Sequence, residues 1–353
     1  MRVLKLLVVL AAAALALAPL PRGAVERIYA RTIYPILQPP VTALANSTPF
    51  AWFDVVVLVA TALLVMMWLT RLVRRRAGAA KVIAGLTLDT LAAVAVFYLW
   101  FLGSWGLNYR REPLRAQLDF QEHRITTEAL RALALRNVES LNALHGAAHA
   151  AGWVELAEMR SVLAPAFVHA QQDLAMSWRV EPGRPKRSLF DFYFTRVSID
   201  GMTDPFFLET LANQSLLPFE RPATVAHEWS HLAGYADESE ANFLGWLVCM
   251  RGPASVQYSG WLSLYGTVVN ALPRGDRDEM IRALAPGPRQ DLRAIGERIQ
   301  RHIVPVASRA GYALYDRFLK ANRVEAGIRS YSDVIRLLLG TSFDADGSPV
   351  LRR

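Results

Sequence analysis

The chain has 353 residues, of which 53% are hydrophobic and 20% are charged. It is therefore too apolar for an ordinary soluble protein and too charged for a polytopic transporter. The net charge is +8, but the basic residues are not interleaved with aromatic ones, so we expect no nucleic-acid partner. The single cysteine, Cys249, excludes an intramolecular disulfide, so stability must come from the core and from any bound metal.

The apolar residues are concentrated in three N-terminal segments, at about 6–20, 51–69 and 82–107. A membrane-spanning helix needs about 20 residues to cross roughly 30 Å of hydrocarbon. The second and third segments meet that length, whereas the first is slightly short. Residues 16–18 have the small-x-small form of a cleavage site, so the first segment could instead be a signal peptide. We expect residues 1–107 to be a membrane region in contact with the lipid bilayer.

The loop between the second and third segments indicates the orientation. From Arg71 to Lys81 it carries five positive charges and no acid. By the positive-inside rule this loop stays in the cytoplasm. We therefore expect a multi-pass protein of the cell (inner) membrane, with residues 108–353 forming one domain on the extracytoplasmic side.

Residues 108–353 are expected to be mainly helical, with a small sheet ahead of residue 227. Residues 189–199 partly alternate with period two and are rich in aromatic and β-branched side chains, which predicts a strand. A second short strand is expected near residues 206–208. The helices are predicted from apolar residues at helical spacing. They cover residues 113–151, 153–178, 255–272, 277–285, 288–320 and 330–340.

The most informative motif is the pentad His227-Glu228-Trp229-Ser230-His231. On a helix the two histidines stand one turn apart on the same face, so both imidazoles can reach one metal ion. Glu228 is rotated by about 100° from His227, so it can hold a water near that metal but is badly placed to bind it. Pro222 is expected to open this helix and Gly234 to close it.

Acidic residues follow the pentad and supply candidates for a third ligand. Asp237 is expected to cap the next helix, with Glu240 completing a capping box. Glu238 and Asn242 stand one turn apart and can turn back toward the histidines. Glu238 would then bind the metal and Asn242 would accept a hydrogen bond from a histidine N–H. Asp237, whose spacing matches the metzincins, and Glu240 remain alternative ligands.

A second pair of histidines, His145 and His149, also stands one turn apart on a predicted helix. No acid lies between them. Such a pair is more often an exposed or capped helix face than a pair of ligands, so we expect no metal there.

The sequence resembles two related groups of proteins. Glu238-x-x-Ala241-Asn242 after the pentad is similar to the Glu-x-x-Ala-Asp helix of the gluzincin peptidases, with Asn242 where they have Asp. More closely, the chain resembles domain-of-unknown-function family 3810, a bacterial membrane family grouped with the zincin peptidases. The resemblance implies a membrane-anchored, zinc-dependent, zincin-like peptidase domain. The matching pieces are the hydrophobic segments, 217–219, 227–243, 258–260, 319–322 and 330–331.

These observations favour a zinc metallopeptidase. Zinc would be held by His227, His231 and Glu238, and Glu228 would act as general base in hydrolysis of an amide bond in a protein or peptide substrate of the envelope. Tyr258 is a candidate donor to the oxyanion. Two alternatives stay open: an envelope scaffold or binding protein with a structural zinc site, and a zinc amidase acting on a non-protein substrate.

Overall fold

The computed structural model describes residues 2–73, 78–324, 327 and 333–352, and these are mainly helical. A two-stranded antiparallel sheet is formed by β1 and β2, with Gly201 opposite Ala212. The mainly helical fold predicted from the sequence is confirmed. In chain order the elements are α1 (Arg2–Leu17), α2 (Arg22–Ala24), the π-helix η1 (Val25–Ile33), α3 (Tyr34–Asn46), α4 (Trp52–Val73), α5 (Ala79–Ser104), the 3-10 helices η2 (Gly106–Arg110), η3 (Leu114–Ala116) and η4 (Glu122–Arg124), α6 (Thr127–Ala151), the 3-10 helix η5 (Leu156–Glu158), α7 (Met159–Asp173), α8 (Asp191–Val197), β1 (Gly201–Asp204), β2 (Glu209–Ala212), α9 (Arg221–Leu232), α10 (Glu238–Met250), α11 (Ala254–Ala271), α12 (Arg274–Ala283), α13 (Pro286–His302), α14 (Pro305–Ala321) and α15 (Val334–Gly340).

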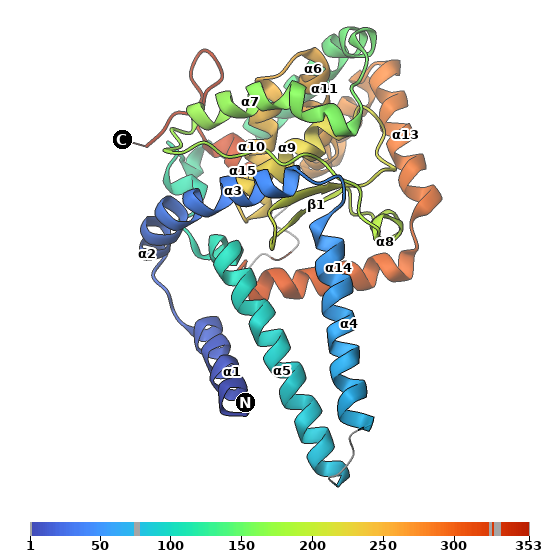
Figure 1. The fold of residues 1–353 in the computed structure, drawn as a ribbon. Helices are drawn as coiled ribbons and strands as arrows, with labels where there is room; N and C mark the ends of the chain where they lie inside the picture. Colours follow the sequence, from blue (N-terminus) through green and yellow to red (C-terminus); the bar gives the residue numbers. More distant parts are fainter. Residues whose placement is uncertain (1, 74–77, 325–326, 328–332, 353) are drawn as a thin grey trace.

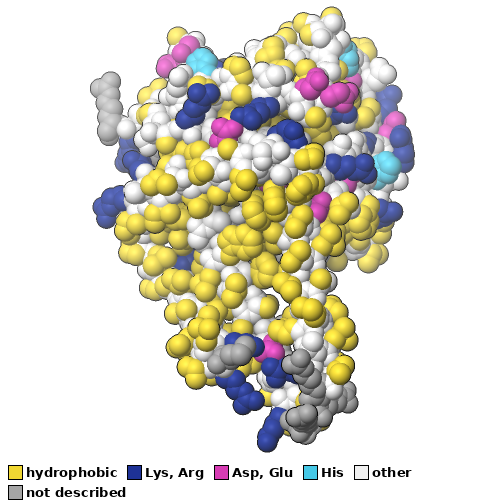
Figure 2. All heavy atoms as spheres, in the orientation of Figure 1, with side chains coloured by type: hydrophobic (Ala, Val, Ile, Leu, Met, Phe, Trp, Pro, Cys, Tyr) yellow, Lys and Arg dark blue, Asp and Glu magenta, His cyan; other side chains and the backbone are white. Residues whose placement is uncertain are grey.

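Three N-terminal helices extend away from the rest of the molecule (Figure 1). Among the described residues, α4 and α5 are long and apolar enough to cross a membrane. The pair formed by α1 and residues 22–46, bent by 112°, would make a third span if it counts as one. Hydrophobic side chains cover this part of the surface, and basic side chains gather at its far end (Figure 2). These candidate spans indicate contact with a lipid bilayer.

A buried acid connects the three extended helices. The carboxylate of Asp89, on α5, lies 2.5 Å from Lys5 Nζ on α1 and 2.5 Å from an Arg71 nitrogen on α4. An acid inside an apolar helix needs such partners, because an unpaired charge is costly away from water. The ion pairs therefore fix the three helices relative to one another.

The strand predicted at residues 189–199 is wrong, because this segment contains helix α8. Its buried residues, Asp191, Phe194 and Val197, recur every three positions, which is the spacing of a helix face. Ser188 supports the helix start, since its hydroxyl accepts a hydrogen bond from the N–H of Phe190 at 3.0 Å. The sheet does lie ahead of α9, as predicted, but its strands are β1 and β2, and residues 206–208 form the turn between them.

Three predicted helices are also shorter than expected. Of the helix predicted over residues 153–178, only η5 and α7 form, and α7 ends at Asp173. Residues 113–126 contain short 3-10 turns and isolated bridges, so α6 begins only at Thr127. The single helix predicted over residues 288–320 is divided into α13 and α14. Pro305 explains the break, because it has no N–H to donate and pushes Val304 into an extended conformation.

One hydrophobic core surrounds α9 and includes residues from both ends of the chain. The side chain of Trp229, on α9, is fully buried against Phe167 of α7, with ring centroids 5.3 Å apart. Tyr34 and Trp105, from the N-terminal region, belong to the same core. Helix α14 lies across the base of the globular part (Figure 1), where the Phe318 ring packs 5.9 Å from that of Phe101 of α5.

Candidate metal site

Helix α9 presents the two histidines of the pentad on one face. Pro222 lies in its first turn, where the missing N–H removes no helical hydrogen bond. The helix ends at Leu232, and Gly234 then adopts a φ of +84°, a left-handed conformation that favours glycine. Both predicted helix ends are therefore confirmed. The rings of His227 and His231 have centroids 4.7 Å apart.

The Nδ1 atoms of both histidines are held by carbonyl oxygens. His227 Nδ1 lies 2.9 Å from Asn242 Oδ1, and His231 Nδ1 lies 2.8 Å from the backbone oxygen of Tyr235. A carbonyl oxygen can only accept a hydrogen bond, so each Nδ1 carries a proton. In the neutral rings the lone pair is therefore on Nε2, the atom that a metal would bind.

Glu238, the first residue of α10, faces both Nε2 atoms. Its Oε2 lies 3.2 Å from His227 Nε2 and 3.6 Å from His231 Nε2. Its Oε1 accepts a hydrogen bond from the hydroxyl of Tyr315 on α14. Burial alone would raise the pKa of Glu238, but the facing imidazoles lower it overall. Burial likewise opposes protonation of His231, yet the Glu238 carboxylate raises the pKa of this histidine to about 9.

The three side chains could hold a metal ion. Their ligand atoms all lie within 4.8 Å of one another. Glu238 Oε2 is buried without a hydrogen-bond donor of suitable geometry, and the lone pairs of two neutral imidazoles would point at it. This arrangement requires a positive charge at its centre, either a proton or a metal cation. Two imidazole nitrogens and one carboxylate oxygen are a common zinc ligand set that leaves one tetrahedral position open.

The other two acids that follow the pentad, Asp237 and Glu240, bond to backbone N–H groups. Asp237 caps α10, since its Oδ1 accepts from the N–H of Ser239 at 2.9 Å, as predicted. Glu240 does not complete a capping box. Its Oε1 accepts from the backbone N–H of Leu114 at 2.6 Å, because that buried N–H begins η3 and needs an acceptor. Burial raises the pKa of Glu240 to about 7.

Glu228 lies on α9 with the two histidines, but its side chain contacts the sheet. Thr203 of β1 donates its hydroxyl to Glu228 Oε2 at 2.9 Å. Gly201 permits this close approach, since a Cβ there would lie 2.6 Å from Glu228 Oε1. Burial raises the pKa of Glu228, although the two histidines partly oppose the shift. The site therefore contains a buried carboxyl group with a raised pKa, placed beside the three converging side chains.

Comparison with known proteins identifies a family. A family model described as "Protein of unknown function (DUF3810)" matches residues 29–339. The chain belongs to this family. No curated protein matches the chain, and no solved structure matches it. The matched region of this DUF3810 protein includes both candidate spans and every side chain of the candidate metal site.

Residues from the N-terminal region of the DUF3810 chain support the carboxyl end of α9. The indole Nε1 of Trp105 donates to the backbone oxygen of His231 at 2.9 Å. The hydroxyl of Tyr34 donates to the backbone oxygen of Leu232, also at 2.9 Å. The last carbonyls of a helix have no partner within the helix. Trp105 and Tyr34 supply those partners, so the backbone that carries His231 is held by the part of the chain that flanks the candidate spans.

Two contacts of the site have no counterpart in the sequence analysis. The hydroxyl of Thr203 donates a hydrogen bond to Glu228, and the hydroxyl of Tyr315 donates one to Glu238. Neither donor stands in a recognisable motif, and Tyr315 follows Glu238 by 77 residues. Tyr258, which the sequence suggested as an oxyanion donor, instead donates its hydroxyl to Asp291 at 2.6 Å.

Proposed function

We propose that this protein is a membrane-anchored zinc metallopeptidase that cleaves an amide bond in a protein or peptide of the cell envelope. The observation that carries the proposal is that α9 supplies both two candidate metal ligands and a separate acid. His227 and His231 converge with Glu238, while Glu228 is held beside them by Thr203. Zinc bound by the three side chains would act as a Lewis acid and lower the pKa of a water from 15.7 to about 7.

Glu228 is the residue that moves the proton. Its carboxylate accepts a proton from the attacking water and later delivers it to the leaving amine. The position of Glu228 supports this role, because Thr203 holds its carboxylate beside the three side chains that would bind the metal. A purely structural zinc site would need no buried acid of this kind, so the scaffold alternative leaves Glu228 without a role.

The sheet supports a peptide as the substrate. Lys186 lies against the outer side of β2, at Leu211, whereas in the described part of the chain the outer edge of β1 has no strand partner. β1 also carries Thr203, which bonds to Glu228. An extended peptide added to this edge would gain main-chain hydrogen bonds beside the metal ligands.

The test of the proposal is hydrolysis by the full-length protein purified in detergent. We expect cleavage products when it is incubated with a pool of envelope-derived peptides, read by mass spectrometry. A chelator should abolish cleavage and added zinc should restore it, because unligated His227, His231 and Glu238 cannot activate water. Cleavage that persists after complete zinc removal would contradict the proposal.

We also propose that residues 108–353 face away from the cytoplasm, on the basis of the basic loop between Arg71 and Lys81. A reporter enzyme that is active only outside the cytoplasm, fused after Arg353, is expected to be active. A reporter active only inside should be silent at the same position. The reverse pattern would place the metal site in the cytoplasm.

A further inference from the structure

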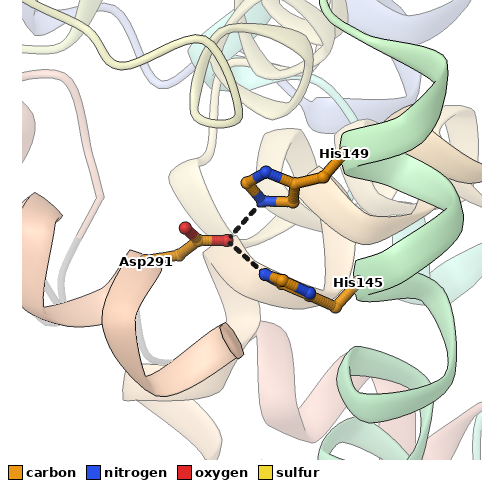
Figure 3. Close-up of side chains that lie close together, drawn as sticks. All are labelled: His145, His149 and Asp291. Carbon is orange, nitrogen blue, oxygen red and sulfur yellow. Dashed lines mark hydrogen bonds and ion pairs between the residues drawn. The ribbon is translucent and has the colours of Figure 1, made fainter. Parts of the chain in front are cut away.

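A second cluster of metal-binding side chains lies between α6 and α13. His145 and His149 project from successive turns of α6, and Asp291 projects toward them from α13 (Figure 3). Asp291 follows His149 by 142 residues. The two histidines were expected to form an exposed helix face, but the fold supplies the acid that the local sequence lacks.

The geometry of the cluster is that of three ligands around one point. Both Nε2 atoms face the same oxygen, Asp291 Oδ2, at 2.9 Å from His149 and 3.6 Å from His145. The three ligand atoms lie within 4.8 Å of one another. In a tetrahedral zinc site with bonds of about 2.0–2.2 Å, neighbouring ligand atoms lie roughly 3.3–3.5 Å apart. The two observed nitrogen–oxygen distances, 2.9 and 3.6 Å, lie just below and just above that range.

Charge at the cluster also points to a cation. Asp291 is 6% exposed, and in the described part of the chain no lysine or arginine nitrogen lies within 4.0 Å of its carboxylate. The partners of its Oδ2 are the two histidines and the Tyr258 hydroxyl, so only the histidines or a bound cation can offset the charge of this buried carboxylate. The histidine side chains are 27% and 38% exposed, so an ion could reach the cluster from solvent.

The surroundings hold the side chains in place. Tyr258 donates its hydroxyl to Asp291 Oδ2 at 2.6 Å. The His145 ring lies against Gly287 of α13, where a Cβ would come 2.4 Å from the ring atom Cε1. Trp153 and Phe219 pack around the His149 ring, with centroids 5.8 and 6.2 Å away. Such hydrogen bonds and packing orient ligands in known metal sites.

We propose that His145, His149 and Asp291 form a second site for a divalent transition-metal ion, with zinc as the expected occupant. Two imidazoles and one carboxylate suit zinc and leave its fourth position to water. The ion connects α6 to α13. This proposal uses none of the residues of the site on α9, so it stands or falls independently of the proposed peptidase function.

The experiment counts zinc in a protein that lacks the first site. The full-length His227→Ala/His231→Ala variant is stripped with chelator in detergent, dialysed against zinc and analysed by elemental mass spectrometry. We expect one zinc per chain, and none after Asp291→Asn is added. Tyr258→Phe should keep the site but weaken zinc affinity by roughly 10- to 100-fold, as for other partners of metal ligands.

The matched control is His302→Ala, which removes an exposed histidine from the same helix as Asp291 and should leave the zinc count unchanged. Thermal unfolding with and without zinc gives a second measurement, since an ion that binds the folded state raises the Tm. That rise should disappear with Asp291→Asn.

A zinc count that is unaffected by both Asp291→Asn and His145→Ala would overturn the proposal, and the cluster would then be a hydrogen-bonded network of histidine, aspartate and tyrosine. If Asp291→Asn fails to fold, His145→Ala decides, because His145 lies too far from Asp291 for a hydrogen bond. A wild-type protein that retains this zinc but hydrolyses nothing would contradict only the peptidase function.

Discussion

Replacing Glu228 with glutamine is expected to leave zinc bound and to lower turnover by roughly 10²–10⁴-fold, the range of a lost acid–base group. The substitution keeps nearly the same volume and an oxygen that can accept from Thr203, so α9 should keep its structure. The amide cannot take a proton from water at neutral pH. Zinc content and hydrolysis of the same peptide pool are measured side by side in the wild type and the variant.

The matched control for this experiment is Glu139→Gln, an identical substitution at an exposed position of α6. It should change neither zinc content nor turnover. Undiminished hydrolysis by the Glu228→Gln variant would show that this carboxylate is not the proton acceptor. Combined with full zinc content, that result would favour a structural role for the metal.

Glu238→Gln is expected to weaken zinc binding at the first site by more than about 100-fold, because it removes the only charged ligand, a larger change than loss of a ligand's partner. Glu240→Gln, the same substitution two positions later, should keep zinc. In the wild type the Glu240 carboxylate accepts a hydrogen bond from the N–H of Leu114, and the amide oxygen of glutamine can replace it in that bond. Zinc affinity is measured by competition with a chromogenic chelator, in the Asp291→Asn background so that only one site is counted.

Equal loss of zinc in the two variants, or loss only with Glu240→Gln, would assign the third ligand elsewhere. The free energy of unfolding serves as the structural check. Glu240→Ala would leave the buried N–H of Leu114 without an acceptor, at a cost of about 1–3 kcal/mol. The glutamine variant should therefore be clearly more stable than the alanine variant.

The parts of the site that depend on local spacing could be predicted from the sequence. The face shared by His227 and His231 follows from the helical period, and the ends of α9 follow from Pro222 and Gly234. Glu238 could be reached because a tight turn joins its helix to α9. Each of these inferences spans only a few residues, over which backbone geometry restricts what can be adjacent.

The parts that depend on tertiary structure could not be predicted. Tyr315 and Asp291 reach their partners across 77 and 142 residues, and no local pattern marks either residue. The segment containing α8 was mistaken for a strand because aromatic and β-branched residues favour strands in general. What decides its structure is burial of one side chain in three against the rest of the domain, together with the support from Ser188.

The residues that support the candidate metal site are synthesised at different times. The ribosome makes the chain from its N-terminus at about 5–20 residues per second, so Tyr34 and Trp105 exist before α9 and Tyr315 exists only long afterwards. The backbone of His231 can thus be fixed early, whereas the 77 residues that separate Glu238 from Tyr315 take about 4–15 seconds to synthesise. A nascent chain halted before α14 would carry all three ligands of the first site without the hydroxyl that orients Glu238. Under the proposed function, full metal affinity would therefore be reached only after α14 has been synthesised.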